Sequence, residues 1–118
     1  MNSLPVVALP EVEGDLRSGV LHYSSWRSDG EEHFLQMYEE TVSWIGWNPE
    51  TFPKKLGEVR RAILKNSYYI VYFIIIADRS VVLAVLDGRR EPSEIRSLVK
   101  QRNSRTKQSS ERRLHRRG

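Results

Sequence analysis

The chain has 118 residues, of which 39% are hydrophobic and 29% charged, with three histidines and no cysteine. This composition is typical of one soluble globular domain, and the lack of cysteine excludes disulfides, thiolate catalysis and cysteine-ligated zinc. The longest apolar run, residues 68–77, is too short to cross a bilayer as a helix, and the first residues lack the order of a signal peptide, so we expect a cytoplasmic protein.

The formal charge of +4 is unevenly distributed along the chain. Residues 1–50 carry two basic and nine acidic side chains, a net charge of −7. Residues 51–100 carry ten basic and five acidic side chains (+5), and residues 101–118 carry seven basic side chains and one acid (+6). This asymmetry predicts a surface that attracts polyanions, formed by the second half of the chain.

The first half of the sequence predicts a short strand followed by two helices. The apolar run 4–9 has Pro5 near its start and Pro10 directly after it, which limits it to an edge strand. Apolar residues recur every three or four positions from Glu11 to about Arg27, as in a helix with one buried stripe. Residues 28–31 have the order of a capping box and predict a second helix, which Pro49 ends. We expect an antiparallel hairpin in which Gly19 permits close packing, anchored by tryptophans: Trp26, Trp44 and Trp47.

The second half predicts three strands and a helix. A loop at 51–57 precedes strands at 60–64, 68–77 and 81–86, and the apolar strand 68–77 should be covered on both faces. We expect its tyrosines to serve the core: Tyr68, Tyr69 and Tyr72. Pro92 begins a short helix that we expect to end at about Lys100. The boundaries are then a single domain at 1–100 and a basic tail at 101–118, which we expect to be disordered when alone, with a helix induced by a polyanion as the alternative.

Four features in this order resemble the RelE/ParE superfamily of bacterial toxins over roughly residues 5–100. They are Asn48-Pro49 after the helix hairpin, Arg60-Arg61 opening a strand, the tyrosine-rich run 68–72, and the run 83–92 with its Gly88-Arg89-Arg90 turn. The long helix hairpin with Asp15 and Phe34 resembles the ParE branch most.

This resemblance implies an α+β fold: an N-terminal edge strand, an antiparallel helix hairpin packed on a small antiparallel sheet, and a short C-terminal helix. It implies the toxin of a type II toxin-antitoxin system, which inhibits growth, takes part in plasmid stabilisation and is neutralised by a cognate antitoxin with an acidic and apolar tail. The ParE branch acts on DNA gyrase without a catalytic set, so the leading expectation is a binding protein that has no cofactor and no metal. The residues expected to contact the target or the antitoxin are Arg89, Arg90, Arg60, Lys54, Lys55, Trp47 and Tyr69.

Two alternatives remain open at this point. A RelE-type endoribonuclease that cuts mRNA on the ribosome would use Arg90 with Arg60 or Arg61 and the loop lysines, because cations stabilise charge on the reacting phosphate. Against it, Tyr69 stands where the resemblance places a second catalytic arginine, and the acidic Asp87 stands where a histidine is expected. The other alternative is a domain that binds nucleic acid without specificity through residues 101–118.

Overall fold

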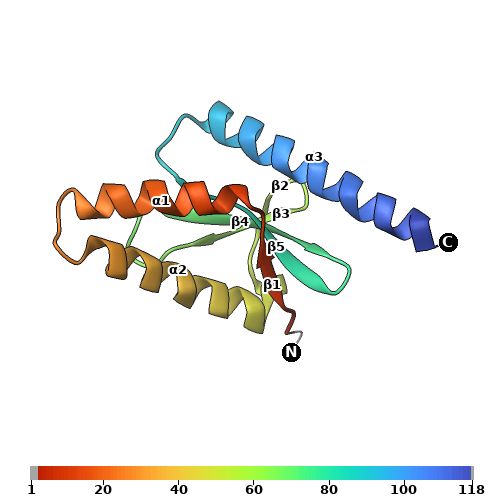
Figure 1. Cartoon of the computed structure of the whole chain (residues 1–118), viewed down its shortest axis with the longest axis horizontal. Coiled ribbons are helices and arrows are strands. Elements are labelled where there is room, and N and C mark those ends of the chain that lie inside the picture. The colour runs from red at the N-terminus through yellow and green to blue at the C-terminus, as the bar shows by residue number, and fades with distance from the viewer. Residues whose placement is uncertain (1–2, 118) are drawn as a thin grey trace.

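The computed structural model describes the backbone of residues 3–117 and the side chains of residues 3–108 (Figure 1). One five-stranded sheet has the order β1-β5-β4-β3-β2. The helices α1 and α2 cover one of its faces, and the helix α3 covers the other. In chain order the elements are β1 (Val6–Ala8), α1 (Glu11–Ser24), α2 (Gly30–Trp47), the 3-10 turn η1 (Pro49–Thr51), β2 (Lys54–Leu56), β3 (Val59–Ile63), β4 (Tyr69–Ile76), β5 (Arg79–Asp87) and α3 (Pro92–Arg117).

The sheet is mixed, and this corrects the expectation of an antiparallel one. The strands from β2 to β5 pair antiparallel in succession, but β1 pairs parallel to β5 through the register Val6 to Ser80 and Ala8 to Val82. The reason is topological: the helix hairpin carries the chain to the far edge of the sheet, and three antiparallel steps return it beside β1 in the same direction. As predicted, β1 is an edge strand.

Alternate residues of β4 feed two separate cores, as its two-faced apolar pattern predicted. Tyr69, Val71 and Phe73 face the helix hairpin and pack in a cluster that contains Phe34. Ile70, Tyr72 and Ile74 face the other side and pack with Ile95 and Val99 of α3. The strand is therefore buried on both faces and acts as the centre of the molecule.

Close packing of α1 against α2 depends on Gly19 and not on the tryptophans. A Cβ at Gly19 would lie 2.2 Å from the ring of Phe34, so the glycine permits the predicted close packing. The tryptophans expected to anchor the hairpin are instead exposed, at 60%, 56% and 49% for Trp26, Trp44 and Trp47. The apolar stripes of α1 and α2 already fill the interface with Val12, Tyr23, Phe34, Met37 and Ile45.

Three local expectations also differ from the structure. The capping box does not form: Asp29 precedes α2 without a side-chain cap, and its carboxylate binds Arg27 at 2.6 and 2.8 Å instead. Tyr68, expected in the core, lies just before β4 and is 63% exposed, whereas Tyr69 and Tyr72 are buried as predicted. The region predicted as a loop at 51–57 contributes the short strand β2.

The C-terminal helix is much longer than the expected end near Lys100. α3 has 26 residues, and it includes the segment predicted to be a disordered tail, of which residue 118 lies outside the described backbone. The tail prediction followed apolar content, which ends near Val99, but polar contacts continue beyond it. Arg102 is only 9% exposed and bonds to the body of the protein.

Within the described residues, no helix has the length and apolar character needed to cross a membrane.

Candidate functional site

The turn after β5 sets the position of the two arginines that the sequence singled out. Its Gly88 donates a backbone hydrogen bond to the carbonyl of Tyr68 at 2.7 Å. A Cβ at Gly88 would lie 2.7 Å from the Cδ1 of Ile70 and 3.0 Å from that carbonyl, so a side chain would require the Ile70 side chain or the turn to shift. The glycine therefore allows the turn that carries Arg89 and Arg90 to lie close to the start of β4.

Arg89 is engaged by its neighbours. Its guanidinium donates to both carboxylate oxygens of Asp87, at 3.1 and 2.8 Å, and lies 4.2 Å over the ring of the exposed Tyr68. These hydrogen bonds lower the pKa of the Asp87 carboxyl below its ordinary value and raise the pKa of the Arg89 guanidinium. The charge of Arg89 is thus balanced within the turn, and its ring contact fixes the side chain over Tyr68.

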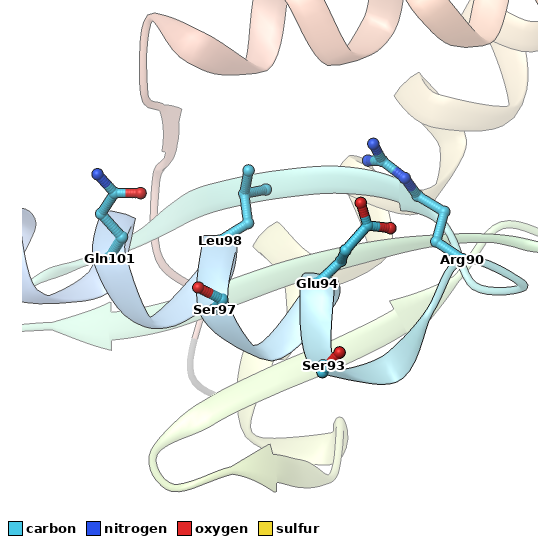
Figure 2. A pocket seen from close by; sticks show the side chains of 6 residues that line it. All are labelled: Arg90, Ser93, Glu94, Ser97, Leu98 and Gln101. Atoms are coloured by element: carbon cyan, nitrogen blue, oxygen red, sulfur yellow. The ribbon is translucent and has the colours of Figure 1, made fainter.

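Arg90 lies at one end of a shallow groove along α3, with a volume of about 420 Å³. Figure 2 shows Arg90 and Glu94 at the same end of this groove and Gln101 at the other. The remaining lining residues are Ser93, Ser97 and Leu98. The groove is open to solvent. Arg89 and Arg90 are both exposed, but the guanidinium of Arg89 is bound to Asp87.

The other cations singled out from the sequence lie on β2 and β3 and not at the turn after β5. Arg60 donates from Nη1 to the backbone carbonyls of Phe52 at 2.7 Å and Glu50 at 3.2 Å, so it holds the turn before β2. Lys54 and Lys55 are exposed on β2, the outermost strand.

Arg61 faces the opposite side of the sheet from Arg60, because successive residues of a strand alternate. It pairs in register with Tyr72, whose burial raises the pKa of its hydroxyl. A phenol with a raised pKa does not ionise more readily at neutral pH, so this pair gives no general base.

The structure does not bring the predicted catalytic arginines together. Arg61 lies opposite Tyr72 and the Arg90 turn follows Asp87, which lies opposite Tyr69. Three residue steps along β4 separate these positions by about 10 Å, in addition to the offset across the strands. Tyr69 itself is 7% exposed and packs against Phe34 at a ring distance of 5.0 Å, so its side chain lies in the core.

Trp47, which we expected to contact the target or the antitoxin, is 49% exposed. It forms an edge-to-face pair with Trp44, with ring centroids 5.9 Å apart, near the C-terminal end of α2. The Ser3 hydroxyl donates to the Trp47 carbonyl, so the segment before β1 crosses this helix end.

A buried ion pair that the sequence did not suggest ties three elements together. The Asp15 carboxylate of α1 accepts from Arg102 of α3, and both side chains are about one-tenth exposed. Asp15 also accepts from the backbone N–H of Val85 at 3.0 Å, while Arg102 donates to the carbonyl of Leu83 at 2.9 Å. The helical spacing could have indicated that Arg102 is buried, since this residue continues the buried stripe of Ile95 and Val99.

This pair covers an irregular stretch of the sheet edge. Leu83 is an extra residue in β5, because Tyr72 pairs with Ala84 but Phe73 pairs with Val82. The pairing of β5 with β1 also ends at Val82. The side chains of Asp15 and Arg102 therefore satisfy backbone groups that β1 no longer reaches.

Comparisons with known proteins identify the fold. A chain of a solved structure described as the chromosomal ParDE TA system from P. aeruginosa matches with a TM-score of 0.59, over 72% of this chain and 96% of that one. The chain has a ParE-like fold. The sequence identity is 18%. No family model and no curated protein matches this sequence.

Proposed function

We propose that this protein is the toxin of a type II toxin-antitoxin pair, that it acts by binding DNA gyrase, and that a cognate antitoxin neutralises it. The observation that carries the proposal is the ParE-like fold, since the solved structure that matches it belongs to a ParDE system. Fold alone does not determine activity, so the choice between the branches in this proposal rests on the arrangement of the candidate residues.

The arrangement supports binding over RNA cleavage. Arg60 is committed to two backbone carbonyls, Tyr69 is buried in the core, and Arg61 lies on the opposite face from Arg60. Cleavage of RNA needs cations and a proton-transfer group converging on one phosphate. Arg89, the neighbour of Arg90 in the chain, is already bound to Asp87.

The antitoxin would meet basic and apolar surface. The exposed residues that suit an acidic and apolar partner segment are Arg90 with its groove, the lysines of β2, and the Trp44–Trp47 pair. Opposite charge at such a surface accelerates association and sets the register of the partner. A short reading frame beside the gene that encodes an acidic-tailed protein would supply this partner.

The deciding experiment is to induce the protein alone in bacterial cells and to follow growth, gyrase–DNA complexes and transcripts together. We expect arrested growth, trapped gyrase–DNA complexes and intact transcripts, and we expect co-expression of the adjacent acidic protein to restore growth. Cuts in mRNA at ribosome-dependent positions, without trapped gyrase, would contradict the proposal.

Variants of Arg90 test the site within the same assay. Arg90→Ala should reduce growth inhibition at equal expression, because this exposed cation is not required by the core. Arg96→Ala is the matched control, since Arg96 is also an exposed arginine near the start of α3 but does not line the groove. Equal toxicity of the two variants would remove Arg90 from the binding surface.

A further inference from the structure

The helix α3 changes character along its length. Its first third is held by apolar packing through Ile95, Leu98 and Val99. From Lys100 to Arg113 the sequence contains no hydrophobic residue. A helix that is polar on every side is not held by a core, so the later part of α3 needs another explanation.

The middle of α3 is held by charge. Arg102 binds Asp15, Arg105 binds Glu11, and Lys107 binds Glu58 at 3.1 Å. The pKa of the Glu11 carboxyl is lowered by its hydrogen bond from Arg105, and that of Glu58 by its hydrogen bond from Lys107. Three of the seven basic residues after Gln101 are thereby balanced by acids of the body.

The last part of α3 carries the other four. The helical backbone continues for ten residues beyond Lys107, about 15 Å at the rise of an α-helix. Figure 1 shows this end of α3 running past the sheet and the helix hairpin. Its sequence contains Arg112, Arg113, Arg116 and Arg117 with a single acid, Glu111.

We propose that residues 109–117 of α3 form a nucleic-acid-binding arm that contacts the phosphate backbone of duplex DNA without reading its sequence. The basic residues of this segment are all arginine, apart from His115, and guanidinium groups bind phosphate oxygens in pairs. The sequence analysis placed nucleic-acid binding in all of residues 101–118. Because the basic residues at 102, 105 and 107 pair with acids of the body, we assign this binding to residues 109–117. The proposal is independent of the gyrase target.

The test measures binding of the full chain to a short labelled duplex DNA of mixed sequence by fluorescence anisotropy, across a range of salt concentrations. We expect affinity to fall with salt. Arg112→Gln with Arg113→Gln should weaken binding and reduce the salt slope by about 0.9 for each phosphate that the variant no longer neutralises. The matched control is Arg105→Gln with Lys107→Gln, which removes the same charge from positions paired with the body and should leave the salt slope unchanged.

Three results would overturn the proposal. They are equal weakening in the two double variants, no weakening in either, and stronger displacement of the labelled DNA by polyglutamate than by unlabelled duplex DNA at an equal concentration of charge. The last result would show a surface for acidic protein and not for nucleic acid. Circular dichroism of both variants checks that helix content is retained, and a duplex of unrelated sequence should bind with the same affinity.

Discussion

Asp15 and Arg102 are 87 positions apart in the chain, yet they form a two-point ion pair, with 2.7 Å between Oδ2 and Nη1 and 3.2 Å between Oδ1 and Nη2. The pair joins the first and last helices around the edge of β5. It also bonds to Leu83 and Val85, so each charged group has partners besides the other. A buried pair of this kind is stable only when its remaining hydrogen-bonding groups are also satisfied.

Removing the arginine of this pair should destabilise the protein strongly. Arg102→Gln leaves the Asp15 carboxylate buried without its cation, and we expect the free energy of unfolding to fall by about 3–5 kcal/mol in urea titrations. Arg17→Gln is the control, because Arg17 and Glu13 lie 3.6 Å apart on the surface and their pair should contribute less than about 1 kcal/mol. Similar destabilisation of the two variants would contradict the role given to Arg102.

Two glycines of α1 should respond in opposite directions to alanine. Gly19→Ala places a methyl group against the Phe34 ring and should cost about 1–3 kcal/mol through overpacking, partly offset by better helix propensity. Gly14 has nothing within 4 Å of the position of a Cβ, so Gly14→Ala should stabilise the protein by up to about 1 kcal/mol. Thermal denaturation of both variants checks this; stabilisation by both would show that Phe34 moves freely.

The turn after β5 should lose stability in acid. The folded-state pKa of Asp87 is lowered by its hydrogen bonds from Arg89, so the contribution of this pair is fully present above the unfolded value of about 3.9. It is lost as the pH falls below that value and through the lowered folded pKa.

An NMR titration of the Asp87 carboxyl should therefore show a midpoint below the ordinary value for aspartate. In Arg89→Gln the midpoint should move upward, because the variant lacks the guanidinium hydrogen bonds. An unchanged midpoint would mean that the pair does not form in solution.

Truncations should separate the two parts of α3. Removing residues 109–118 should leave the unfolding temperature nearly unchanged, whereas removing 102–118 should lower it at least as much as Arg102→Gln does. The longer deletion takes away the cover of the β5 edge, and the shorter one spares it. If both truncated proteins have the unfolding temperature of the full chain, Arg102 does not stabilise the fold.

Sequence patterns predicted the parts of the fold that depend on local periodicity. The helices of the hairpin and strands β3 to β5 follow from apolar spacing, and the two-sided burial of β4 follows from its continuous apolar run. The parallel pairing of β1 was not predicted, because pairing direction depends on the path of the whole chain. The exposed tryptophans were expected to pack in the hairpin, because hydrophobicity alone does not show which face of a helix will be buried.

The candidate site was predicted less well, for a physical reason. A sequence shows that Arg60, Arg89 and Arg90 are cations but not which acceptors they meet. Arg60 bonds to backbone carbonyls, and Arg89 to a carboxylate two positions away. Arg102 was assigned to a tail because charge is usually solvated, whereas its acid partner is supplied by a distant helix.

The cover of the β5 edge also implies an order of folding. The sheet and the helix hairpin precede Arg102 in the chain, so a ribosome completes β5 before it makes the residue that covers the bulge at Leu83. Joining Asp15 to Arg102 closes a long loop, which is entropically disfavoured until the intervening elements are compact. A nascent chain therefore passes through a state in which part of a strand edge is open to any extended segment nearby.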